Sequence, residues 1–84
     1  MPRGRKPGEA IWRTPNRYVT TICNELHVER VRLNIAQSDL AETIGIHPYT
    51  LSNWEHGRSH PGLFYLLCWT QALGFSLHLK KEKL

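Results

Sequence analysis

The chain has 84 residues and a formal net charge of +4, with 40% apolar and 21% charged residues. This length is expected to hold one small domain and to leave no room for a separate sensor or catalytic domain. The composition is normal for a folded domain with one thin core, and small cores often gain stability by oligomerising.

No apolar run approaches the roughly 20 residues that span a bilayer, and no apolar stretch follows the basic N-terminus as it does in a secretion signal. Cys23 and Cys68 are far apart and lie among apolar residues. This favours buried reduced thiols over a disulfide. These features predict a soluble cytoplasmic protein with no membrane partner.

The basic residues are concentrated at the two ends of the chain. Residues 1–17 carry a net charge of +4, residues 18–79 carry −2 and residues 80–84 carry +2. A mildly acidic body with basic ends suits a polyanionic partner that the arms hold. Solvated, disordered tails explain the same pattern, and charge alone does not separate the two interpretations.

Residues 1–13 are expected to form a flexible, extended arm, because prolines and glycines recur in the first eight residues. Thr14 followed by Pro15 is typical of a helix start, with Thr14 as the N-cap. Apolar residues then recur at helical spacing, which predicts a helix over 14–33.

Three shorter helices are expected at about 37–44, 48–56 and 63–73, each followed by a glycine that suits a helix end: Gly45, Gly57 and Gly74. Residues 75–80 alternate between apolar and polar, as a β-strand does, although a fifth helix stays open. The expected fold is all-α, with four helices in residues 14–74 and a short strand and basic tail in residues 75–84.

The helices at 37–44 and 48–56 form the central feature of the chain. Ala41 is small enough for the two helices to approach closely. Leu51 and Trp54, three residues apart, are expected to point inward and to leave four polar residues facing out: Tyr49, Thr50, Ser52 and Asn53. This geometry presents the N-terminal half of one helix to a DNA major groove.

Several residues stand in a fixed register over this region: Gln37, Leu40, Ala41, Gly45, Leu51, Trp54, Glu55, Gly57, Pro61, Ala72, Leu73 and Gly74. In this register the chain resembles the phage repressor and Cro type of helix-turn-helix domain, the xenobiotic-response-element family, over about residues 26–76. The resemblance implies a transcriptional regulator. The form we expect is a dimeric repressor on an inverted-repeat operator, with two recognition helices about one DNA turn apart.

The resemblance also implies which residues touch DNA. The positions that read base edges are Pro48, Tyr49, Thr50 and Asn53, and the amide of Asn53 matches adenine. The positions that meet phosphates are Gln37, Ser38, Ser52, Arg58, Ser59 and His60. Arg30 and Glu55 occupy the positions of a structural ion pair between the first and third helices.

Two positions depart from the family pattern. His47 stands where the family usually has Ser or Thr, so the helix N-cap is expected to be weaker or made otherwise. Pro48 replaces a side chain that forms hydrogen bonds in relatives. Specificity is therefore expected to depend mainly on Tyr49, Thr50 and Asn53.

The N-terminal arm contains a second, shorter motif. Residues 2–7 resemble an AT-hook, whose Arg-Gly-Arg core enters the minor groove of A·T-rich DNA. The minor-groove residues are then Arg3, Gly4, Arg5 and Lys6. A non-specific basic tail is the alternative.

The end of the domain indicates an association surface. Phe64 and Cys68 lie four apart at positions that are usually polar in relatives, beside the predicted strand. We expect a two-fold homodimer through five residues: Phe64, Cys68, Phe75, Leu77 and Leu79. The same surface suits a cognate toxin, so an antitoxin that autoregulates its operon is the alternative function.

An enzyme is not expected. His56 and His60 straddle Gly57, which disfavours helical metal pairing, and Cys23 with His27 lacks a third ligand. No cofactor, metal site or effector pocket is expected. Regulation would then depend on concentration, proteolysis or a partner.

Overall fold

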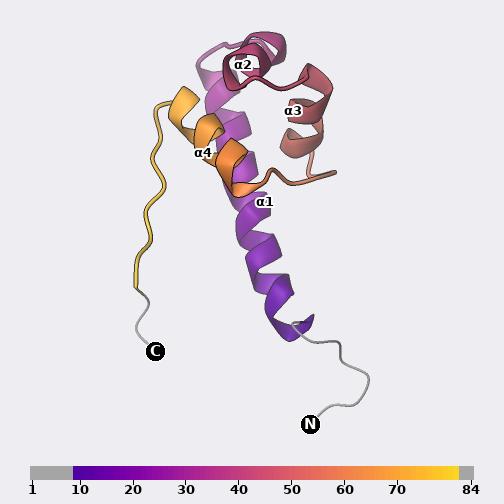
Figure 1. The fold of residues 1–84 in the computed structure, drawn as a ribbon, viewed down its shortest axis with the longest axis vertical. Coiled ribbons are helices and arrows are strands. Elements are labelled where there is room, and N and C mark those ends of the chain that lie inside the picture. Colours follow the sequence, from indigo (N-terminus) through magenta and orange to yellow (C-terminus); the bar gives the residue numbers. More distant parts are fainter. Residues whose placement is uncertain (1–8, 82–84) are drawn as a thin grey trace.

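The computed structural model describes residues 9–81 of the chain, and the side chains of residues 17–81. It contains four helices in this part: α1 (Glu9–Arg32), α2 (Gln37–Ile44), α3 (Pro48–Glu55) and α4 (Leu63–Ala72). The three short helices gather around the C-terminal half of α1, and an extended segment follows α4 (Figure 1). The described residues are therefore all-helical in their regular structure, as the periodicity predicts.

All four helices contribute to one core. The buried apolar residues are Cys23, Leu26, Leu40, Ala41, Ile44, Leu51, Trp54, Trp69 and Leu73. Trp69 is fully buried, and its ring lies 5.8 Å from that of Trp54, so α3 and α4 share an aromatic contact. Both cysteines are free; Cys23 is buried, as expected, whereas Cys68 is only half-buried. Burial raises the pKa of the Cys23 thiol.

The turn between α2 and α3 depends on Gly45. Its φ is +88°, a left-handed conformation in which a side chain would be strained even though the space around it is open. The N–H groups of Gly45 and Ile46 both donate to the carbonyl of Ala41, at 2.8 and 2.9 Å. These bonds close the end of α2 and send the chain directly into α3.

The start of α1 differs from the prediction. The helix begins at Glu9 rather than at Thr14, so residues 9–13 of the predicted arm are helical and Pro15 lies within the helix. Glu9, Ala10 and Arg13 have high intrinsic helix propensity, and this outweighs the start signal at Thr14. The four predicted minor-groove residues, Arg3, Gly4, Arg5 and Lys6, lie outside the described residues.

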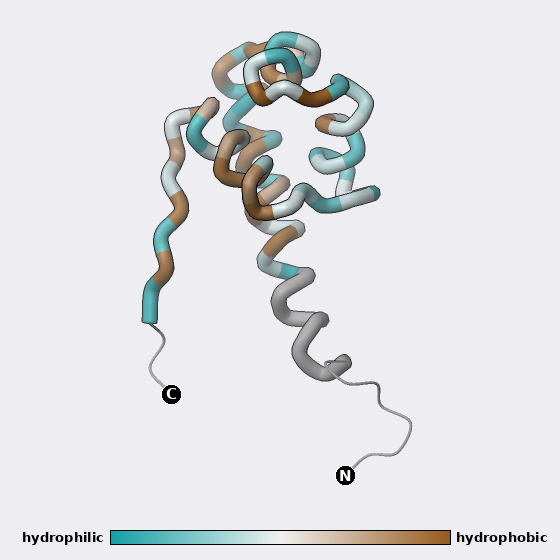
Figure 2. The backbone as a smooth tube through the Cα atoms, viewed as in Figure 1, coloured by the Kyte–Doolittle hydropathy of each residue, from teal (hydrophilic) through white to brown (hydrophobic). Residues whose placement is uncertain are grey.

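The segment that follows α4 is extended. Residues 75–81 have neither helix nor strand pairing, so the fifth helix is not what the structure has in this segment. The N–H of Phe75 donates to the carbonyl of Thr70 at 2.8 Å, and Leu79 farther along is fully exposed. Hydrophobic and hydrophilic residues alternate along it (Figure 2). A strand requires a partner strand, so the predicted pairing stays a prediction.

None of the described helices is long and apolar enough to cross a membrane.

Candidate nucleic-acid interface

The helix α3 has one buried face and one outward face. Leu51, Trp54 and Glu55 are buried, at the i, i+3, i+4 spacing of a single helix face. Tyr49 is 67% exposed on the other side, and Asn53 is half-buried. One face of this helix therefore packs against the rest of the domain, and the other face is open to solvent.

The first turn of α3 is stabilised by an unusual cap. His47 adopts an extended conformation, and its Nδ1 accepts a hydrogen bond from the N–H of Tyr49 at 3.0 Å. Pro48 occupies the first helical position, where its missing N–H has no helical partner to lose. The cap is thus made by an imidazole in place of the usual hydroxyl, which agrees with the expectation that it is made otherwise.

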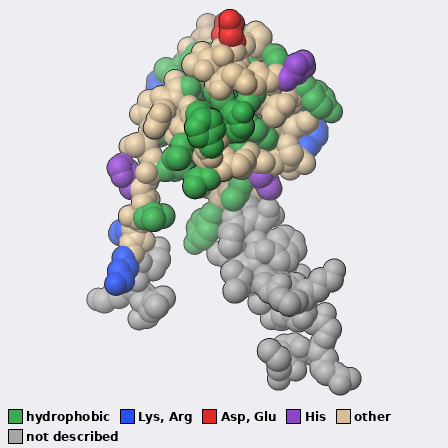
Figure 3. Space-filling model, viewed as in Figure 1, with side chains coloured by type: hydrophobic (Ala, Val, Ile, Leu, Met, Phe, Trp, Pro, Cys, Tyr) green, Lys and Arg blue, Asp and Glu red, His purple; other side chains and the backbone are tan. Residues whose placement is uncertain are grey.

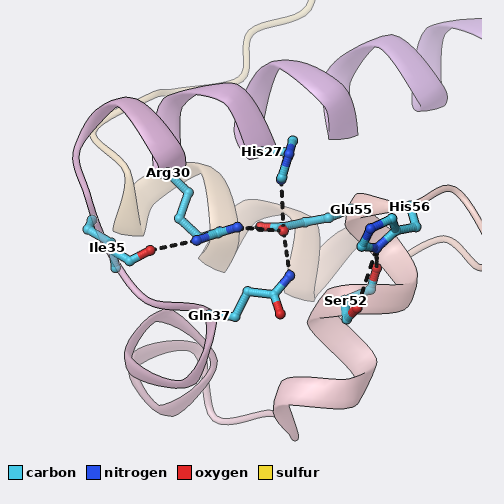
Figure 4. Close-up of polar contacts among 7 residues, drawn as sticks. All are labelled: His27, Arg30, Ile35, Gln37, Ser52, Glu55 and His56. Atoms are coloured by element: carbon cyan, nitrogen blue, oxygen red, sulfur yellow. Dashed lines mark hydrogen bonds and ion pairs between the residues drawn. The ribbon is translucent and has the colours of Figure 1, made fainter.

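The buried carboxylate of Glu55 joins three helices (Figure 4). Arg30 of α1 donates to it twice, from Nε to Oε2 at 2.7 Å and from Nη2 to Oε1 at 3.0 Å. Nδ1 of His27 donates at 2.9 Å, and Nε2 of Gln37, the first residue of α2, donates at 2.8 Å. We call His27, Arg30, Gln37 and Glu55 the Glu55 cluster. The ion pair expected between Arg30 and Glu55 is present.

The Glu55 cluster determines the charge state of its carboxyl group. Burial alone would raise the pKa of Glu55, but the hydrogen bonds from Arg30, Gln37 and His27, and the charge of Arg30, outweigh it and lower that pKa. Arg30 also donates from Nη1 to the carbonyl of Ile35 at 2.6 Å, which ties the turn after α1 to the same group. The position of α3 is therefore fixed by an ionised, fully paired carboxylate.

The predicted DNA-contacting residues differ in their exposure. Ser38, Pro48, Tyr49, Arg58, Ser59 and His60 are exposed, and Thr50, Ser52 and Asn53 are half-buried. Gln37 differs from the others because one of its amide N–H groups is directed to Glu55. His27 is a member of the Glu55 cluster that the sequence analysis missed, since it lies 28 residues from its partner and belongs to no motif.

A second surface lies where α4 meets the extended segment. Ile22, Leu63, Leu67, Leu77, His78 and Leu79 line a groove of about 400 Å³. Among the predicted dimer residues, Leu77 and Leu79 line this groove, Phe64 is 69% exposed, and Cys68 is half-buried against the core. Hydrophobic side chains gather on this face over α4 (Figure 3). Leu63 and Leu67 of α4 were not predicted, because this helix is apolar on nearly all sides and its outward face could not be told from its buried one. Ile22 of α1 was not predicted either, because its place beside α4 depends on how the two helices lie in space.

A helix-turn-helix family model matches residues 26–79, which include α2, α3 and α4. The chain belongs to the helix-turn-helix family. Members of this family bind DNA and are not enzymes, so the chain is a DNA-binding transcriptional regulator. Comparison with curated proteins and with solved structures gives no significant match.

Proposed function

We propose that this helix-turn-helix protein is a cytoplasmic, dimeric repressor that places α3 in the major groove of an inverted-repeat operator. The observation that carries the proposal is the arrangement of α3. Its inner face is held by the Glu55 cluster, and its outer face presents polar side chains from an N-terminus that is capped. A rigid helix with an outward polar face is what base reading requires.

The base-reading residues are Pro48, Tyr49, Thr50 and Asn53. Asn53 has a donor and an acceptor on one planar group, which together match the N7 and N6 positions of adenine. Tyr49 is 67% exposed, and its ring and hydroxyl would reach a thymine methyl or a phosphate. Pro48 has no hydrogen-bonding side chain, so its contact with DNA is apolar.

Phosphate contacts surround this reading face. Ser38 at the start of α2, Ser52 within α3, and Arg58, Ser59 and His60 just after α3 supply hydroxyl, guanidinium and imidazole groups. Gln37 keeps one amide hydrogen for a phosphate while the other stays on Glu55. The arm residues Arg3, Gly4, Arg5 and Lys6 enter the adjacent minor groove.

The dimer forms through Phe64, Cys68, Phe75, Leu77 and Leu79. In antiparallel pairing of two extended segments about Leu77, Phe75 lies opposite Leu79 of the partner subunit, and all the apolar residues share one face. Among the described residues, the backbone groups of 76–81 form no backbone hydrogen bond, so they are available for such a ladder. The apolar face of the two paired segments then packs against the apolar groove.

The DNA-binding proposal is tested by selecting sites from a randomised duplex library with the full chain. Wild-type protein is expected to enrich an inverted repeat and to bind it at least about a thousandfold more tightly than random duplex. Asn53→Ala should lose about 1–3 kcal/mol of preference at one base pair in each half-site. Asn24→Ala, an exposed asparagine on α1, is the matched control and should change no preference. Equal, steeply salt-dependent binding to all duplexes would contradict the proposal.

The arm has its own test. Deleting residues 1–8 removes Arg3, Arg5 and Lys6, and it should lower the slope of log affinity against log salt by about two or three units. An unchanged slope would place the arm away from the DNA.

The oligomeric state is tested by sedimentation equilibrium. Leu77→Asp puts a charge on the apolar face and should give a monomer, whereas Ser76→Asp, at an exposed position of the same segment that does not line the groove, should leave the dimer intact. The apolar groove also supports the second candidate function, an antitoxin whose groove binds a cognate toxin. A wild-type chain that aggregates unless it is co-expressed with its gene neighbour favours the antitoxin over the plain repressor.

A further inference from the structure

The C-terminal end of α3 turns back on itself at Gly57. This glycine has a φ of +74°, and its N–H donates to the carbonyl of Trp54 at 3.2 Å. The N–H of Arg58 donates to the carbonyl of Asn53 at 2.9 Å. This pair of bonds is the closing pattern that a left-handed glycine produces after a helix. It returns the backbone of Arg58 to the last turn of α3, next to Asn53.

A side-chain contact joins the same two residues. Nη1 of Arg58 donates to Oδ1 of Asn53 at 3.1 Å. Backbone and side chain of Arg58 therefore both bind Asn53, the first at its carbonyl and the second at its carboxamide. A hydrogen bond with a charged donor such as a guanidinium is stronger than one between two neutral groups.

We propose that Arg58 is a positioning residue that fixes the carboxamide of Asn53 for base reading, and this inference rests on the proposed function. A guanidinium group has only donors, so the carboxamide must turn its oxygen, and never its NH₂, toward Arg58. The oxygen has a second lone pair for the N6 amino group of adenine, and the NH₂ is left for N7. Arg58 thus fixes the orientation of the carboxamide, and with it which base atom meets the acceptor of Asn53 and which meets its donor.

This role differs from a phosphate contact in what it predicts. Loss of a phosphate contact weakens binding to every sequence equally and lowers the salt slope by about one unit. Loss of a positioning contact instead lowers the preference at the single base pair that Asn53 reads. The other N–H groups of Arg58 remain free to meet the DNA backbone, so the two roles are separable within one residue.

The test combines three variants with the randomised duplex library. Asn53→Ala locates the base pair that Asn53 reads, where a bidentate contact supports a preference of roughly 5- to 150-fold. Arg58→Ala is expected to reduce the preference at that same pair, and to have no further effect on it when Asn53 is already alanine. Arg32→Ala is the matched control, since Arg32 pairs with Glu29 on α1 and its loss should leave the preference at that pair unchanged.

A second readout needs no DNA. In the free protein, the side-chain amide signals of Asn53 in NMR spectra should shift and lose order in Arg58→Ala, while thermal melting confirms that the fold is kept. A uniform loss of affinity in Arg58→Ala, with the base preference intact, overturns the inference alone, and so does an unchanged Asn53 amide. A wild-type chain without any base preference overturns the proposed function and this inference with it.

Discussion

Replacing Arg30 by alanine should destabilise the fold far more than the same replacement of its exposed neighbour Arg32. Arg30 makes two bonds to the carboxylate of Glu55, whose side chain is fully buried, and a third to the carbonyl of Ile35. Breaking a buried ion pair from one side costs about 3–5 kcal/mol, because a charge is left without its partner. In Arg30→Ala, Glu55 keeps its hydrogen bonds from Gln37 and His27 and can take up a proton. We therefore expect a loss at the lower end of this range, about 3 kcal/mol.

Urea denaturation followed by tryptophan fluorescence measures this change, since Trp54 and Trp69 are in contact in the core. The control is Arg32→Ala, two residues along the same helix, where an exposed pair with Glu29 is screened by solvent and its loss should hardly move the midpoint. Arg30→Lys keeps the charge without the forked geometry and should fall between the two, which preserves the test if the alanine variant does not fold. Equal midpoints for the two alanine variants would refute the role assigned to the Glu55 cluster.

Three further predictions concern α3 and its two ends. His47→Ala removes the cap on the N–H of Tyr49 and should cost about 0.5–2 kcal/mol in the same denaturation assay, whereas His47→Ser supplies another acceptor and should restore stability. Gly57→Ala forces a side chain into a left-handed conformation and should cost about 1–2 kcal/mol, while Gly57→Asn, which tolerates that conformation, should cost less. The lowered pKa of Glu55 means that its contribution is complete above the ordinary value of about 4.5 and is lost as pH falls through the lower value of the folded protein. The stability advantage of wild type over Glu55→Gln should therefore shrink below about pH 4.5, and a constant difference down to pH 3 would contradict the assignment.

Local sequence patterns were sufficient to predict the two helices of the helix-turn-helix, α2 and α3. The bounds of α2 and α3 follow from the spacing of Leu40, Ile44, Leu51 and Trp54, and their ends follow from glycines at positions with positive φ. These signals act over one or two turns of chain, so they do not depend on the rest of the fold. The start of α1 could not be predicted in the same way, because Pro15 and the helix-forming residues before it give opposite local signals.

Local sequence patterns could not predict the side-chain contacts between residues that lie far apart in the sequence. The pairing of Arg30 with Glu55 was expected from family resemblance, but the contribution of His27 depends on how α1 and α3 lie in space. The contact between Arg58 and Asn53 depends on the turn at Gly57, which a glycine in the sequence permits but does not require. The strand expected after residue 75 needs a second strand, and one chain cannot show it.

The helix α3 has one buried face and one outward face, and this arrangement affects how the protein can change over evolutionary time. Substitutions at Tyr49, Thr50 and Asn53 leave the contacts of Glu55 untouched, because the support comes from the opposite side of the helix. Replacements at these positions therefore alter the outward surface of α3 while the Glu55 cluster stays intact. A variant altered on this outward face would need to retain the apolar core, the glycines that end α2 and α3, and the Glu55 cluster.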